Sequence, residues 1–160
     1  MSSLSTLGIL HTLVSICALG AGVAALLRGG RIALADSLGR SYAWLTALSA
    51  ASGLFIFAHG GFGIAHVLAL LTLLTLLVAL LARRSRLFGR AALATETVAL
   101  SATLLFHMIP GITETTTRLP AGAPLFASAE EPALQAIIGA LALLFLAGAA
   151  WQVRALRRAA

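Results

Sequence analysis

Long apolar runs, separated by short polar or basic stretches, make up most of this chain. An α-helix rises 1.5 Å per residue, so about 20 apolar residues cross the ~30 Å hydrocarbon core of a bilayer. Five runs have roughly that length, and each one predicts a transmembrane helix. The expected helices span about residues 4–27, 41–58, 64–82, 91–113 and 132–153. The pattern therefore predicts an all-α integral membrane helical bundle that forms a single domain over residues 1–160.

The basic residues predict how this bundle is oriented. When successive loops are assigned to alternate sides, ten of the eleven basic residues fall together and Arg118 alone falls opposite. Cytoplasmic loops carry an excess of basic residues. We therefore expect a multi-pass protein of the bacterial inner (plasma) membrane, with its N-terminus outside and its C-terminus in the cytoplasm. The ten arginines on the predicted cytoplasmic side are Arg28, Arg31, Arg40, Arg83, Arg84, Arg86, Arg90, Arg154, Arg157 and Arg158.

The overall composition agrees with a membrane protein and excludes several other classes. Hydrophobic residues make up 60% of the chain and charged residues 10%, whereas a soluble domain is about a quarter charged. The bilayer is thus the expected partner. The net charge of +6 does not indicate nucleic-acid binding, because the arginines punctuate apolar runs and match no recognition motif. A single cysteine, Cys17, excludes an intrachain disulfide.

Polar residues on one face of the fourth apolar run are the first candidates for a site. Glu96, Thr103, His107, Pro110 and Glu114 share a helical face by their spacing. Ionisable groups within a membrane are costly and commonly functional. The predicted topology divides them, because Glu96 lies near the cytoplasmic arginines and is expected to be structural. His107 and Glu114 lie in the outer half.

All four histidines of the chain fall in that predicted outer half, His11, His59, His66 and His107. Two histidines on facing helices could ligate haem b axially for electron transport. His11 and His107 match best in depth, with His66 as a substitute. A stripe of small or polar residues in the first helix would give the macrocycle room; it consists of Gly8, His11, Ser15, Ala18 and Gly22.

Two other interpretations of the same residues remain open. Three of these histidines, with or without Glu114, could bind zinc, copper or iron for hydrolysis, transport or sensing. Alternatively, the histidines hydrogen-bond neighbouring helices, Glu114 pairs with Arg118, and the chain is a non-enzymatic accessory subunit of a membrane partner or a homo-oligomer. No hydrolase, phosphate-loop or dinucleotide motif is present, so the sequence does not establish whether the protein is an enzyme.

Several short motifs resemble an uncharacterised bacterial family of small multi-pass predicted membrane proteins. They are His11-Thr12, Gly39-Arg40-x-Tyr42, GFGIAHVLALLTLLTLL at 61–77 and Glu114-x-x-Thr117-Arg118-Leu119-Pro120. The resemblance implies that His11, His66 and Glu114 are site positions, and it carries a loose likeness to b-type cytochrome bundles. Family members often have further histidines where this chain has Ala35-Asp36 and Glu96. An inner histidine pair of the family is therefore missing here.

Overall fold

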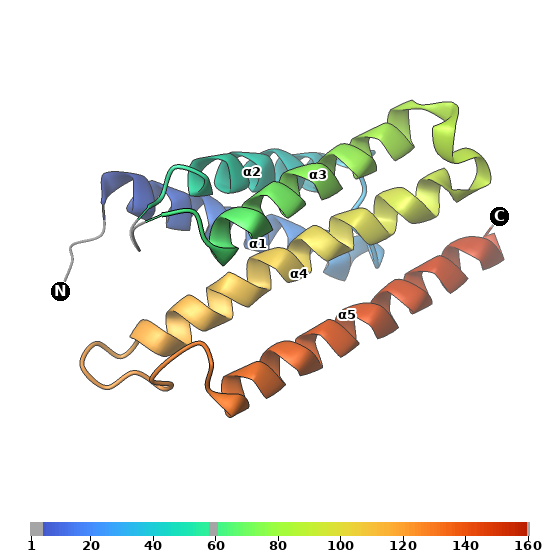
Figure 1. Ribbon diagram of the computed structural model, residues 1–160. Coiled ribbons are helices and arrows are strands. Elements are labelled where there is room, and N and C mark those ends of the chain that lie inside the picture. The colour runs from blue at the N-terminus through green and yellow to red at the C-terminus, as the bar shows by residue number, and fades with distance from the viewer. Residues whose placement is uncertain (1–4, 58–60, 160) are drawn as a thin grey trace.

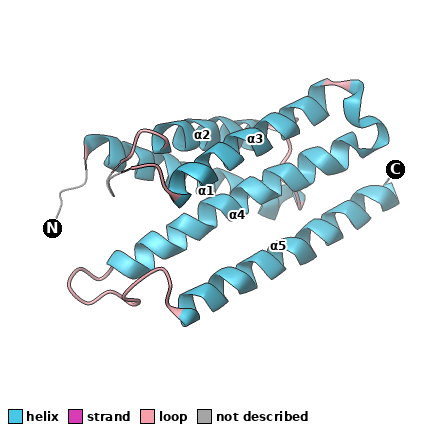
Figure 2. Cartoon of the chain, viewed as in Figure 1, coloured by secondary structure: helices cyan, strands magenta, loops and turns pink. Residues whose placement is uncertain are grey.

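The described residues, 5–57 and 61–159 of a computed structural model, form five α-helices and one short 3₁₀ helix (Figures 1 and 2). The predicted all-α fold is confirmed. The α-helices are α1 (Thr6–Gly29), α2 (Ser37–Gly53), α3 (Ile64–Arg84), α4 (Ala92–Arg118) and α5 (Pro132–Ala159), and η1 (Arg86–Ala91) joins α3 to α4.

Successive helices run in opposite directions, so the connections gather at two ends of the bundle (Figure 1). One end holds the loop 30–36, η1 and the last turns of α5; we call it the arginine end, because the ten arginines named above lie on these segments or beside them. The opposite end holds the start of α1, the segment that follows α2, and the loop 119–131.

Four of the helical segments are long and apolar enough to cross a membrane: α1, α3, η1 with α4, and α5. Large apolar side chains cover the outside of the bundle; Leu143 and Leu144, for example, are each 69% exposed. Such a surface would be costly in water and is favourable in lipid. The expected fifth span is α2, which has 17 residues and would be about 25 Å long. The described residues thus present four candidate spans. Helix α2 is a shorter helix that packs against α1 and α3.

The predicted helix boundaries need correction at α2, α4 and α5. Helix α5 continues past the expected end near residue 153 to Ala159. The second helix begins at Ser37 and ends at Gly53. It ends at Gly53 because the next residues form tight turns, in which the amides of Leu54, Phe55 and Ile56 each donate to the carbonyl three residues earlier. Helix α4 continues past Pro110 to Arg118, so the connection to α5 is shorter than expected. An apolar run by itself does not specify such ends, whereas backbone hydrogen bonding does.

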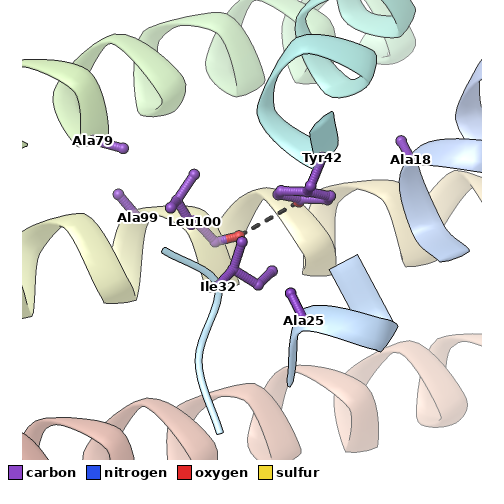
Figure 3. Packing of buried hydrophobic residues seen from close by; sticks show 7 residues of the cluster. All are labelled: Ala18, Ala25, Ile32, Tyr42, Ala79, Ala99 and Leu100. Carbon is purple, nitrogen blue, oxygen red and sulfur yellow. Dashed lines mark hydrogen bonds between the residues drawn. The ribbon is translucent and has the colours of Figure 1, made fainter. Parts of the chain in front are cut away.

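The centre of the bundle is packed with small residues around one aromatic ring (Figure 3). Tyr42 of α2 is fully buried, and its hydroxyl lies 2.7 Å from Thr103 Oγ1 and donates to the Leu100 carbonyl at 3.4 Å. Gly22 of α1 makes room for this ring, since a Cβ there would lie 2.8 Å from Tyr42 Cδ2. Close approach of helices at small residues is typical of membrane bundles.

The Gly39-Arg40-x-Tyr42 motif fixes the loop between α1 and α2. A Cβ at Gly39 would lie 1.9 Å from the Ala33 carbonyl oxygen, so no larger residue fits against that backbone. Arg40 Nη1 donates to the Ala35 carbonyl at 2.8 Å. Close packing at Gly39 and the hydrogen bond from Arg40 to a backbone carbonyl therefore explain the motif.

Candidate functional site

His11 of α1 lies against the last turn of α2. Its Nδ1 atom is 3.1 Å from the Ser49 carbonyl oxygen and 3.1 Å from Ser52 Oγ. Gly53 permits this approach, because a Cβ there would lie 3.3 Å from His11 Cε1. A carbonyl only accepts, so Nδ1 carries the hydrogen in the neutral ring and Nε2 keeps its lone pair. One turn further along α1, Ser15 Oγ lies 2.6 Å from Ser49 Oγ.

His107 of α4 reaches the same helix from another side. Its Nε2 atom lies 3.2 Å from Thr46 Oγ1, and its ring meets Tyr42 edge-on with centroids 6.5 Å apart. Thr46 and Ser49 are one turn apart on α2, so His11 and His107 bind α2 at neighbouring levels. We call these contacts the histidine seam; its members are His11, Ser15, Thr46, Ser49, Ser52 and His107.

His66 caps the start of α3 and shares no hydrogen bond with the histidine seam. Its Nδ1 atom accepts a hydrogen bond from the Gly63 amide at 3.1 Å, and its ring stacks on Phe57 and Phe62 with centroid distances of 4.8 and 5.1 Å. Because Nδ1 accepts, Nε2 carries the hydrogen in the neutral ring. Neither nitrogen then offers a free lone pair, which favours a capping role over ligation of iron or another metal.

The remaining predicted ligands do not join a common site in the part of the chain that is described. His59 lies outside the described residues. Glu114 forms an ion pair with Arg118 one turn on, and its side chain is 54% exposed. Among residues 5–57 and 61–159, no group of three or more His, Cys, Asp and Glu side chains is placed to hold a metal ion. The described residues thus do not bring the predicted metal ligands together. These ligands were His11, His59, His66, His107 and Glu114.

The histidine seam meets one requirement of a haem site, and the stripe of α1 beside it is filled at one position. His11 presents an Nε2 lone pair while its other nitrogen is fixed by a carbonyl, as in many metal-ligating histidines. The room expected along the small-residue stripe of α1 is occupied, however, by Tyr42 and by Leu104, which would lie 3.0 Å from a Cβ at Gly22. At Gly22 the stripe therefore packs α1 against its neighbours, and the space beside this residue is filled.

Buried polar groups at the arginine end form a second cluster, which the sequence patterns did not reveal. Glu96 is 2% exposed; its Oε1 accepts from the Leu34 amide at 2.8 Å and its Oε2 lies 3.6 Å from Arg83 Nη1. This agrees with the structural role predicted for Glu96. Gln152 of α5 accepts from the Ser101 hydroxyl and donates to the Gly30 carbonyl, both at 3.0 Å. A lone amide inside an apolar run was the one available signal for this cluster.

No protein-family model, curated protein or solved structure matches this chain. The geometry of the histidine seam and of the arginine end therefore carries the functional argument.

Proposed function

We propose that this chain is a non-enzymatic accessory membrane protein in which His11 and His107 join helices and His66 caps the start of α3. The observation that carries the proposal is the bonding of the three described histidines. His11 and His107 each bind α2, and His66 binds the first turn of its own helix. Lipid chains cannot hydrogen-bond polar side chains as water does, so these groups bond to neighbouring helices instead. Each such bond stabilises the bundle by about 1 kcal/mol in a membrane.

The remaining architecture supports an accessory role. The connections between helices are short, and the described loops hold no soluble catalytic unit. Exposed leucines and valines cover the outside of the helices, as expected for contact with lipid or with another membrane protein.

The clustering of arginines favours an orientation in the bacterial inner membrane with the arginine end in the cytoplasm. Reporter fusions after Arg31, Arg90 and the C-terminus should all score as cytoplasmic, and a fusion in the loop 119–131 as external.

Substitutions that keep hydrogen bonds but remove ligands provide the decisive test. An asparagine amide can replace a histidine Nδ1–H, and a glutamine amide can replace Nε2. The double variant His11→Asn, His107→Gln should therefore keep thermal stability close to that of the parent protein. The matched variant His11→Leu, His107→Leu should lose about 1–3 kcal/mol, because it leaves Thr46 and the Ser49 carbonyl without these partners. Equal stability of the two double variants would contradict a structural role.

A second candidate, binding of a metal-centred cofactor, is favoured by the free Nε2 lone pair of His11. His11 and His107 would hold the cofactor through their ring nitrogens, and the cofactor would supply electron transfer. Protein purified from haem-replete cells without chelators should then show a Soret band, or stoichiometric zinc, copper or iron. His11→Asn should abolish that signal and lower the thermal stability of the cofactor-loaded protein, because a ligand that binds the folded state stabilises it. A colourless, metal-free preparation would rule this candidate out.

A further inference from the structure

A hollow at the arginine end lies between the end of α1 and the last turns of α5. Its volume is about 160 Å³, and its lining includes Gly30, Arg31, Trp151, Gln152 and Leu156. Gly30 has a left-handed backbone (φ 67°), and the Trp151 ring packs on it, 3.4 Å from where a Cβ would be. The hollow exceeds the ~30 Å³ share of a water molecule several-fold, so a polyatomic group fits.

Arg31 is the charged residue in the lining of this hollow. Its Nη1 atom is buried, and among the described residues it has no hydrogen-bond partner. The two ion pairs found in the described chain, Glu96 with Arg83 and Glu114 with Arg118, do not involve it. A buried cationic donor without a partner is costly. The planar guanidinium matches the oxygens of phosphate or carboxylate in a two-point contact.

The surroundings indicate that such an anion comes from the membrane. Trp151 at the edge of the hollow is 60% exposed, and nearby Leu27 is 83% exposed. Tryptophan prefers the level of lipid headgroups, and the leucine offers an apolar surface for acyl chains. Arg28 and Arg154, both exposed, add positive charge on the same end. Basic pockets between membrane helices on the cytoplasmic side bind anionic headgroups.

We infer that this hollow binds the headgroup phosphate of an anionic phospholipid, with Arg31 as the main ligand. Gln152 is a positioning residue, because its amide already bonds Gly30 and Ser101 and holds α5 beside the loop. The inference goes beyond the proposed function and does not depend on the histidine seam. It requires only that the helices span a membrane.

Binding to lipid in nanodiscs tests the inference directly. The protein, reconstituted in phosphatidylcholine, is titrated with phosphatidylglycerol, and the retained lipid is counted by native mass spectrometry. We expect about tenfold preference for phosphatidylglycerol, reduced to about twofold in Arg31→Gln, as for loss of one charge-assisted contact. The control Arg86→Gln, at the same end but in η1, should keep the preference. Equal preference in Arg31→Gln and the parent would overturn the assignment.

A fluorescence measurement that keeps Arg31 tests the inference even if the Arg31→Gln variant fails to fold. The chain has two tryptophans, so Trp44→Phe leaves Trp151 as the reporter. Brominated phosphatidylglycerol should quench Trp151 more strongly than brominated phosphatidylcholine at equal content. Equal quenching by the two lipids would overturn the inference. If the two lipids quench equally and inorganic phosphate at millimolar concentration changes the Trp151 emission, the site binds a free anion and the lipid assignment fails.

Discussion

Gln152, near the end of α5, donates a hydrogen bond across 3.0 Å to the backbone carbonyl of Gly30, 122 residues earlier in the chain. The same side chain accepts from Ser101 of α4. Of the α5 residues, Leu134 and Gln152 are the buried ones, and α5 packs mainly along α4 (Figure 1). Gln152 therefore connects an otherwise peripheral helix to two separate parts of the bundle.

Gln152→Leu should loosen α5. The variant leaves the Ser101 hydroxyl and the Gly30 carbonyl unpaired, which costs about 1–3 kcal/mol of unfolding free energy. Unfolding monitored by circular dichroism, together with protease cleavage in the loop 119–131, measures the effect. Gln135→Leu is the control, because Gln135 is exposed on the same helix and bonds only the nearby Ala129 carbonyl. Equal losses in the two variants would contradict a special role for Gln152.

Gly39→Ala should disturb the loop between α1 and α2. The added methyl group would overlap the Ala33 carbonyl oxygen, 1.9 Å away, so the backbone must shift, at a cost of about 1–3 kcal/mol. The same substitution at Gly139 meets nothing within 4 Å and should be neutral or stabilising by about 0.5–1 kcal/mol. Thermal unfolding of the two variants compares them. Tolerance of alanine at Gly39 would show that the loop backbone lies elsewhere.

His66→Leu should weaken the start of α3. The Gly63 amide loses its acceptor, a loss of about 1 kcal/mol typical of a helix cap. Hydrogen exchange at the Gly63 amide should accelerate about fivefold, as that free energy implies. His66→Gln keeps an acceptor at this third helical position and should restore much of the protection. Unchanged exchange in His66→Leu would argue that the ring has another task.

Substitutions at Glu96 should separate its two contacts. Glu96→Gln keeps an oxygen for the Leu34 amide and gives up the 3.6 Å ion pair with Arg83. Its effect on unfolding free energy should be below about 1 kcal/mol, because Arg83 is 42% exposed and the pair is solvent-screened. Glu96→Leu also leaves the buried amide unpaired and should cost about 1–3 kcal/mol. A larger loss in Glu96→Gln than in Glu96→Leu would reverse this assignment.

Local spacing predicted two features that lie outside the histidine seam. Glu114 and Arg118 are four residues apart, and their predicted pairing is confirmed. The prediction that α5 begins at Pro132 is also confirmed, since proline suits a first helical turn. Room for a macrocycle beside α1 stays a prediction. At Gly22 the neighbour that fills the space is Tyr42, and the size of the stripe residues does not specify that neighbour.

The sequence by itself determined that this chain is helical, largely apolar on its outside and strongly asymmetric in its arginines. Those properties depend on composition and on the spacing of residues within one helix, and both can be read from neighbouring positions in the sequence. The tertiary structure alone decided which helix each histidine binds, that Gly39 touches Ala33, and that Arg31 and Gln152 line one hollow. These contacts depend on the relative shift and rotation of neighbouring helices, where a displacement of a single turn, about 5 Å, exchanges every partner.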